Sequence, residues 1–259
     1  MSFKLNQTVV DLYMSYKKLY DRVGKLHGWD FSKIQYTCVD NSEFKYFEEI
    51  NKVLRKTDLV LDVGTGGGEK ALKYLNECGF LIGIDNCEAM VAKANENLKD
   101  YPDKRACFLL MSSARLKFPE GFFDVILVRH SCISARENYR CLKNGGYMFS
   151  EDIDETDCLE LKKLFGRGQG FTTKEKLASR TKKDLEKCNF DFRIYEIIQN
   201  EFYKTADDLL FLLYNTPIIP NFGKNEHDFE MLEKYIAKNT TEKGIYLNRR
   251  LFGIIARKR

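Results

Sequence analysis

The residues most suited to chemistry stand in one short stretch, Asp62-Val63-Gly64-Thr65-Gly66-Gly67-Gly68. The apolar run Leu59 to Val63 is too short for a helix and is predicted to be a buried parallel strand. Glycines after such a strand allow the backbone to turn sharply and to approach a ligand closely. A helix predicted to open at Ala71 would point its free N–H groups at that ligand. The stretch therefore predicts a ligand-binding turn between a strand and a helix.

Two kinds of cofactor compete for this turn. Dinucleotide-binding loops require Gly-x-Gly-x-x-Gly or Ala. If the motif begins at Gly64, its final Gly or Ala position is occupied by Glu69, which does not fit. If it begins at Gly66, that position is occupied by Ala71, which fits. Spacing alone therefore leaves a nicotinamide enzyme open. Asp62 favours the other kind, because a carboxylate at the strand end repels a pyrophosphate but attracts a cofactor with a cationic end.

The spacing of Asp62 and the three alternating glycines resembles the first motif of class I S-adenosylmethionine-dependent methyltransferases. Three downstream segments resemble the family's later strands in the same order: Phe80 to Asp85, Phe123 to His130, and Leu142 to Phe149. The resemblance covers residues 58 to about 155. It is specific for the family but not for the methyl acceptor.

This resemblance implies an α/β fold with a seven-stranded, mostly parallel, doubly wound sheet of Rossmann-like type. A helical cap is expected from the N-terminus, together with a late insertion. We interpret residues 1–56 as the N-terminal helical cap and residues 57–259 as the methyltransferase domain. Residues 204–244 would form a helical lid insertion, with one structural domain overall. In this class, such N-terminal helices commonly cover the cofactor and part of the acceptor pocket.

The cofactor implied is S-adenosyl-L-methionine, with S-adenosyl-L-homocysteine as the product. Asp85 comes about 20 residues after Gly64, a spacing that suits a carboxylate bound to ribose hydroxyls. Met90 follows on the next helix, where the family often packs the adenine. Many relatives carry an Asp after the third strand, whereas this chain has Ser112-Ser113-Ala114. The expected cofactor-binding residues are Asp62, Gly64, Thr65, Gly66, Gly68, Asp85, Asn86, Met90, Ser112, Ser113, Ala114 and Arg129.

His130 is the candidate catalytic residue. It follows the predicted fourth strand, and ligands of open α/β sheets bind beyond the carboxyl ends of the strands. Its side chain titrates near neutrality, so it suits the role of a base for an acceptor that must lose a proton. A structural role for this histidine is the alternative. Transfer itself would be an in-line displacement that holds the acceptor atom on the line of the S–CH₃ bond.

Two groups of residues are candidates for contact with the methyl acceptor. Tyr13, Tyr16 and Tyr20 recur at helical spacing and would line the cap, or else belong to the core. Arg167 and Gln169 stand among three glycines, where a loop can present a guanidinium and an amide to a ligand. A plain surface linker is the alternative for this segment.

Composition limits the class of protein. The chain has 259 residues, of which 44% are hydrophobic and 31% charged, as in ordinary soluble globular proteins. No apolar run approaches the roughly 20 residues of a membrane span, and the first residues lack the apolar segment of a secretory signal. A cytoplasmic protein is therefore expected. Eight cysteines without a C-x-x-C pair and three histidines predict free thiols and no metal site.

Three functions remain open from the sequence. The first is a methyltransferase of a small, partly apolar or aromatic molecule, favoured by the cap and by the apolar segment Thr216 to Gly223. The second is an RNA methyltransferase, which the net charge of +4 neither requires nor forbids. The third is a protein that binds the cofactor or its product without turnover. Methylation of DNA base amino groups is disfavoured, since Arg129-His130-Ser131-Cys132 replaces the signature Asn/Asp-Pro-Pro-Tyr/Phe. The oligomeric state is not specified.

Overall fold

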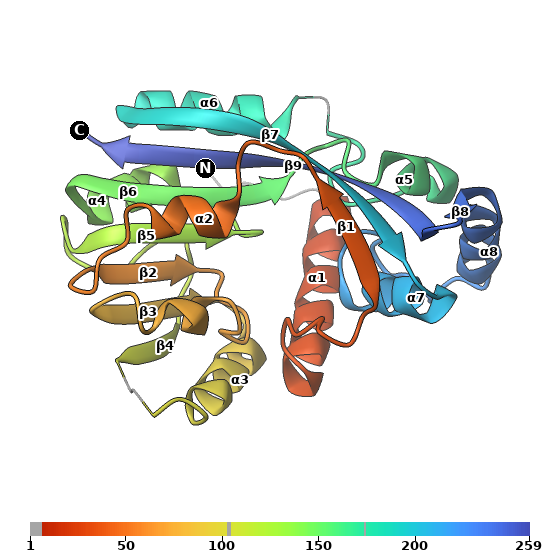
Figure 1. Cartoon of the computed structure of the whole chain (residues 1–259), viewed down its shortest axis with the longest axis horizontal. Coiled ribbons are helices and arrows are strands. Elements are labelled where there is room, and N and C mark those ends of the chain that lie inside the picture. The colour runs from red at the N-terminus through yellow and green to blue at the C-terminus, as the bar shows by residue number, and fades with distance from the viewer. Residues whose placement is uncertain (1–6, 103–104, 174) are drawn as a thin grey trace.

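A mixed sheet runs through the whole molecule (Figure 1). The computed structural model describes residues 7–102, 105–173 and 175–259, with side chains from residue 14 onward. Nine strands belong to the sheet within this described part. In their order across it they are β1 (Tyr36–Asp40), β7 (Phe190–Tyr203), β9 (Gly244–Lys258), β6 (Leu142–Ile153), β5 (Phe123–Arg129), β2 (Leu59–Val63), β3 (Phe80–Asp85) and β4 (Ala106–Leu110), with β8 (Thr240–Thr241) paired to β9.

The sheet has a parallel half and an antiparallel half. Strands β4, β3, β2, β5 and β6 pair in parallel. Strand β9 then pairs antiparallel with β6 and β7, and β7 pairs antiparallel with β1. The α/β fold expected from the sequence is thus confirmed. Seven strands were expected, and the two additional ones are β1 at the far edge and the two-residue β8.

Helices cover both faces and both ends of the sheet (Figure 1). The described ones are α1 (Gln7–Leu26), α2 (Tyr46–Asn51), the 3₁₀ helix η1 (Ala71–Tyr74), α3 (Glu88–Leu98), α4 (Ala135–Cys141), α5 (Leu159–Phe165), α6 (Leu177–Lys187), α7 (Ala206–Asn215) and α8 (His227–Asn239). Helix α1 packs against α3 and stands across the ends of the strands, away from the sheet faces.

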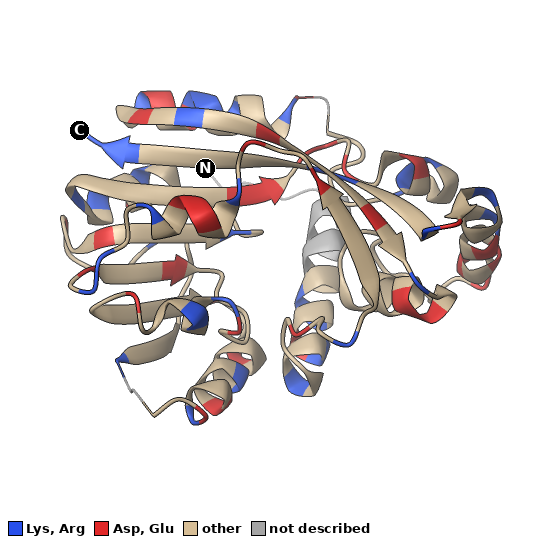
Figure 2. Cartoon of the chain, viewed as in Figure 1, with Lys and Arg blue, Asp and Glu red and all other residues tan. Residues whose placement is uncertain are grey.

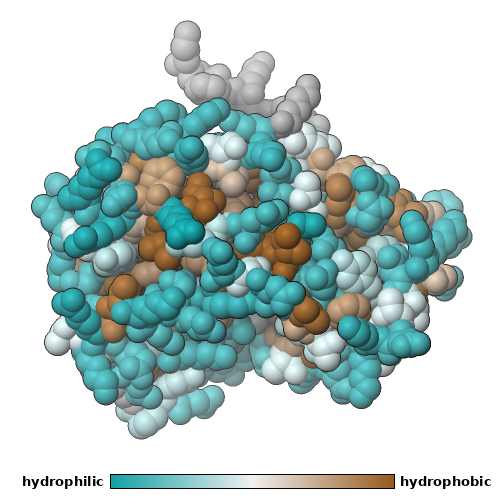
Figure 3. Space-filling view, turned by 45° about the horizontal axis from the view of Figure 1, so that its top comes forward, coloured by the Kyte–Doolittle hydropathy of each residue, from teal (hydrophilic) through white to brown (hydrophobic). Residues whose placement is uncertain are grey.

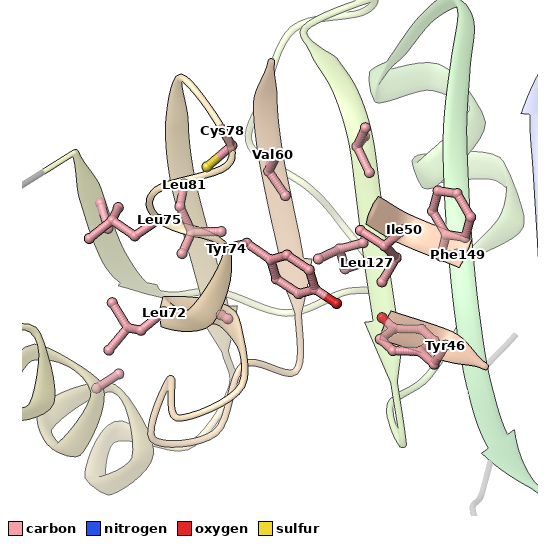
Figure 4. Close-up of a cluster of buried hydrophobic side chains, with 14 of the residues drawn as sticks. Tyr46, Ile50, Val60, Leu72, Tyr74, Leu75, Cys78, Leu81, Leu127 and Phe149 are labelled. Atoms are coloured by element: carbon pink, nitrogen blue, oxygen red, sulfur yellow. The ribbon is translucent and has the colours of Figure 1, made fainter. Parts of the chain in front are cut away.

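Strand β5 shows why the central strands are almost continuously apolar. Val125 and Leu127 point into a core shared with α2 and η1, while Ile126 and Val128 point into a core shared with α4 and α6. Successive side chains alternate between the faces, and both faces are covered, so the positions from Val125 to Val128 suit apolar residues before the strand emerges at Arg129. Figure 4 shows the first of these two cores, where Leu127 lies among side chains from η1 and α2.

Two expectations for local structure were wrong. A regular helix was expected to open at Ala71, but the structure has only the four-residue η1 there. The three consecutive glycines before it have very low helix propensity, and Gly68 has a φ of +76°, outside the helical region. Residues 36–40 were expected within a mainly helical segment but form β1, which extends the sheet instead.

The far end of the antiparallel half carries its own apolar cluster. Side chains of α5, α7 and α8 pack there against β7 and β9. Apolar groups reach the face in Figure 3 only as separate patches surrounded by hydrophilic side chains. None of the described helices combines the length and the apolar composition needed to cross a membrane. The division into a cap (1–56), a domain (57–259) and a lid (204–244) remains an interpretation.

Candidate active site

A cavity of about 1410 Å³ lies beyond the carboxyl ends of the parallel strands and continues over one face of the antiparallel half. Ligand sites usually measure roughly 300–1,000 Å³, so this cavity has room for two ligands side by side. Its parallel half is lined by the ends of β2, β3 and β5, and its antiparallel half by β1, β7 and β9. Helix α1 contributes Tyr16 and Tyr20 to the cover between them.

Most of the residues expected from the sequence do meet here. Those that line the cavity are Tyr16, Tyr20, Asp62, Gly64, Thr65, Asp85, Asn86, Met90, Ser113, Arg129, His130 and Gln169. Those that do not line it are Gly66, Gly68, Ser112, Ala114 and Arg167. The side chain of Tyr13 lies outside the described residues.

The glycine turn has the close backbone geometry that its sequence predicts. Gly64 has a φ of +75° and Gly66 a φ of +56°, both in the left-handed region that favours glycine. The N–H groups of Gly64 and Thr65 donate to the carbonyl of Ile84 at 2.8 and 2.9 Å, which ties the turn to β3. The ring of Trp29 packs so closely on Gly66 that any side chain there would collide with it.

Asp62 and Asp85 line the parallel half of the cavity, and neither has an ion-pair partner among the described residues. Asp62 is 9% exposed, and burial raises its pKa to about 6. Asp85 accepts hydrogen bonds from the N–H groups of Gly66 and Cys87 at 3.0 and 2.9 Å, yet burial still raises its pKa. Buried carboxylates of this kind gain stability when a cationic or hydrogen-bond-donating ligand binds beside them.

Near Asp62 lie two tyrosine hydroxyls and an arginine side chain whose hydrogen-bonding capacity is not used up by described residues. The hydroxyls of Tyr46 and Tyr74 are buried, line the cavity and have no hydrogen-bond partner in the described structure. Figure 4 shows these two hydroxyls directed toward one another. Arg129 donates through Nε to Glu151 Oε1 at 2.9 Å, and its terminal amino groups make no hydrogen bond to described residues. These groups together form a site for an anionic group such as a carboxylate.

His130 lies at the boundary between the two halves. Its φ of +50° is unusual for a residue other than glycine, and its N–H donates to the carbonyl of Glu151 at 2.8 Å. Its ring nitrogens lie 3.8 Å from a Glu151 oxygen and 3.9 Å from an Asp152 oxygen. The left-handed backbone turns this side chain out of the strand and to the cavity wall, so it is placed to exchange a proton with a ligand.

The antiparallel half is lined from strand faces and was missed by reasoning from the sequence. Glu201 and Tyr203 of β7 share a face with Arg249 of β9 and with Tyr36 and Cys38 of β1. The Tyr203 hydroxyl donates to Glu201 at 2.6 Å, and the Arg249 guanidinium lies 3.7 Å from the same carboxylate. The alternation of Glu201 and Tyr203 along β7 was the signal in the sequence, but it identifies a shared face only once the neighbouring strands are known.

Arg167 has a structural partner. Its guanidinium donates to both oxygens of Asp228 at 2.7 and 2.8 Å and to the carbonyl of Pro220 at 3.1 Å. Asp228 also accepts from the N–H of Gly223, so this cluster holds the segment between α7 and α8 against α5. Of the two residues expected in this loop, Gln169 alone reaches the cavity.

Comparisons with known proteins agree with this geometry. Residues 60–146 match the family model described as a methyltransferase domain. An uncharacterized methyltransferase of Schizosaccharomyces pombe is 30% identical over 119 residues, which are 40% of this chain and 42% of that protein. The uncharacterized methyltransferase YcgJ of Bacillus subtilis is 28% identical over 131 residues, 45% of this chain and 51% of that one. The chain thus spans about half the length, or less, of these curated relatives.

Solved structures extend the likeness beyond the matched segment. The crystal structure of YcgJ covers 83% of this chain and 98% of its own, with a TM-score of 0.61 and 18% identity. A phosphoethanolamine N-methyltransferase 2 of Haemonchus contortus, solved with phosphomonomethylethanolamine and S-adenosylhomocysteine, covers 82% of this chain and 51% of its own. Its TM-score is 0.55 at 19% identity, a level that shows the fold. Residues 60–146 thus match a methyltransferase domain, and the strand order and the solved structures give the chain the fold of the class I S-adenosylmethionine-dependent methyltransferases.

Proposed function

We propose that this protein transfers a methyl group from S-adenosyl-L-methionine to a small, partly apolar or aromatic molecule by in-line displacement. The observation that carries the proposal is the divided cavity. Its parallel half has the acids and glycines of the family's cofactor site, and its antiparallel half adds a further space beside them that is lined in part by Tyr36 and Tyr203. When bound, the cofactor supplies an electrophilic methyl group on a sulfonium.

The residues present fit this cofactor group by group. The buried carboxylate of Asp62 suits the cofactor's ammonium, and that of Asp85 suits the ribose hydroxyls. The free amino groups of Arg129 and the unpartnered hydroxyls of Tyr46 and Tyr74 suit the cofactor's carboxylate. Met90 would pack against the adenine, with Asn86 and Ser113 beside it on the cavity wall.

The remaining catalytic task is to orient the acceptor, exclude water and accept a proton. Tyr16 and Tyr20 of α1 cover the cavity and restrict access of water to it. His130 lies where the two halves meet and would accept the acceptor's proton. His130→Gln is expected to lower the turnover number for an acceptor that must be deprotonated, with little change in the affinity for S-adenosylhomocysteine.

The two alternatives from the sequence have less support. An RNA methyltransferase would need a basic surface at the mouth of the site, whereas Figure 2 shows Asp and Glu at the ends of β2 and β6 on the side facing α1. A protein that binds the cofactor without turnover would have no need for the second half of the cavity.

The proposal is tested by methyl transfer from radiolabelled S-adenosylmethionine into a lysate of the source cells, followed by fractionation by size. The Asp85→Ala protein serves as the blank. Label in the low-mass fraction supports the proposal and provides a molecule to identify. Label in RNA would replace it with the second alternative, and a protein that binds S-adenosylhomocysteine but labels no fraction would support the third.

A further inference from the structure

Where the two halves of the cavity meet, most of the charged side chains are paired with a side chain of opposite charge. Glu151 is paired with Arg129 at 2.9 Å. Arg249 lies between Asp157 at 2.9 Å and Glu201 at 3.7 Å. The buried ammonium of Lys162 lies near Asp157 and adds one further positive charge to this cluster. These acids therefore each have a cationic neighbour, and the amino groups of Arg129 that make no hydrogen bond to described residues are those assigned above to the cofactor's carboxylate.

Asp152 is the carboxylate without a Lys or Arg partner in this set. Its one ionisable contact within 4 Å among the described residues is the His130 ring at 3.9 Å, and one of its oxygens accepts the N–H of Ile153. Its side chain is 30% exposed, and it lines the cavity at the end of β6. A positively charged ligand would gain a favourable interaction here without displacing an existing ion pair.

Three of the aromatic side chains that line the cavity are neighbours, and Tyr20 among them lies near Asp152. Tyr20 lies within electrostatic reach of both Asp152 and Asp85, and burial and these charges raise its pKa to about 12. Its ring centroid is 6.4 Å from that of Tyr16 and 5.7 Å from that of Trp29, and all three side chains line the cavity. A tyrosine ring beside a carboxylate can recognise an ammonium group through cation–π attraction and charge together.

We propose that the methyl acceptor is an organic amine, whose ammonium binds between Asp152 and the ring of Tyr20 while its carbon chain extends into the antiparallel half. This inference rests on the proposed function and names the substrate class of the same site. An acceptor that carries only a carboxylate or a phosphate would face Asp152, while Arg249 is already paired with Asp157 and the remaining groups of Arg129 are assigned to the cofactor's carboxylate.

The proton and the electron pairs in the methylation of an amine can each be followed from one group to the next. The ammonium first gives one proton to His130 or Asp152, which frees the nitrogen lone pair. This lone pair forms the new N–C bond as the S–C bond breaks, and the electron pair of the broken bond stays on sulfur. The nitrogen becomes positively charged and the sulfur neutral, so Asp152 faces a cation before deprotonation and after transfer.

The single tryptophan of the chain provides the measurement, because Trp29 lies in the cavity wall. With S-adenosylhomocysteine at saturation, choline is titrated against Trp29 fluorescence, and 3,3-dimethylbutan-1-ol serves as its uncharged isostere. Choline is expected to bind at least about tenfold more tightly than the isostere. Asp152→Asn should remove this preference and leave binding of S-adenosylhomocysteine intact, since it keeps the shape of the side chain and removes its charge.

Two further variants separate recognition from folding. Tyr20→Leu should weaken choline binding, and Tyr20→Phe should restore it, because the ring face and not the hydroxyl attracts the cation. Asp191→Asn, on the exposed side of β7, is the matched control and should change nothing. If S-adenosylhomocysteine binds but choline does not bind, or binds no better than the isostere, the amine proposal is overturned while the proposed function stands. If S-adenosylhomocysteine itself does not bind, the proposed function fails.

Discussion

The two halves of the sheet line the cavity in different ways. In the parallel half, the ligand-facing groups come from turns at strand ends, as with the glycine turn after β2 and Asp85 at the end of β3. In the antiparallel half they come from strand faces, as with Glu201 of β7 and Arg249 of β9. Turns at strand ends form from short local motifs, whereas a strand face is assembled from residues far apart in the chain.

The two halves also differ in whether their charged side chains already have partners within the protein. Asp62 and Asp85 in the parallel half have no ion-pair partner among the described residues, so they stay available for a cofactor. In the antiparallel half, Glu201 accepts a hydrogen bond from the Tyr203 hydroxyl, and Arg249 donates one to Asp157. These side chains are therefore already held in place by other protein groups.

The largest expected effect is on the support of the antiparallel half. Arg167→Ala leaves the Asp228 carboxylate, whose side chain is 2% exposed, without its guanidinium partner. We expect the free energy of unfolding to fall by about 3 kcal/mol, because an uncompensated buried charge is strongly unfavourable. Urea unfolding measures it. Lys163→Ala, which removes an exposed ion pair with Glu160 on the same helix, is the control and should leave the free energy of unfolding almost unchanged.

The variant also distinguishes a supporting role from a ligand contact. If Arg167→Ala is as stable as the wild-type protein but loses affinity for an acceptor, Arg167 contacts ligand, and the ion pair with Asp228 is not its main role.

In the parallel half, the strongest expected effect depends on pH. Burial raises the pKa of Asp62 from 3.8 to about 6. Between these values the unfolded chain releases this proton and the native protein keeps it, so the free energy of unfolding should fall as the pH rises from about 4 to 6. Asp62→Asn should be more stable than the wild-type protein at pH 7, by up to about 3 kcal/mol at roughly 1.4 kcal/mol per pKa unit.

This stability difference should shrink as the pH is lowered to 4, and urea unfolding at both pH values measures it. The same variant should bind S-adenosylhomocysteine more weakly at pH 7, because its amide carries no charge for the ligand's ammonium. Equal stability of the two proteins at pH 7 would show that Asp62 is not strained by burial.

The smallest expected effect concerns the Tyr46 hydroxyl, which the proposal assigns to the carboxylate of the cofactor. Tyr46→Phe removes a buried hydroxyl that has no partner in the described structure, so stability should be unchanged or slightly higher. Affinity for S-adenosylhomocysteine should fall about fivefold, the equivalent of one hydrogen bond of about 1 kcal/mol. Affinity for 5′-methylthioadenosine, which lacks the amino-acid part, should not change. Equal losses for both ligands in calorimetric titrations would place the hydroxyl elsewhere.

The sequence predicted the parallel half well because that half depends on short motifs. The order of apolar strands and the spacing of Asp62, Gly64 and Asp85 predicted that these residues would lie together, and all three line the cavity. The same reasoning predicted a regular helix after the glycine turn, where φ angles of +56° and +76° at Gly66 and Gly68 left only a 3₁₀ turn.

The antiparallel half was harder to predict because its residues meet only through long-range strand pairing. Glu201 pairs with Cys38 across β1 and β7, and these positions lie far apart in the sequence. The segment that contains Cys38 was expected to be helical, so its side of the cavity was not foreseen. Arg167 was expected to meet a ligand because its neighbours are glycines, whereas its buried partner Asp228 lies on a later helix.

The most direct test of the central claim is a calorimetric titration of S-adenosylhomocysteine into the wild-type protein and into Asp85→Ala. The claim is that the parallel half binds this cofactor. It predicts binding of one ligand per chain to the wild-type protein and a loss of about 1–3 kcal/mol in the variant, with the fold checked by circular dichroism. A wild-type protein that does not bind, or a folded variant that binds equally well, would contradict the claim.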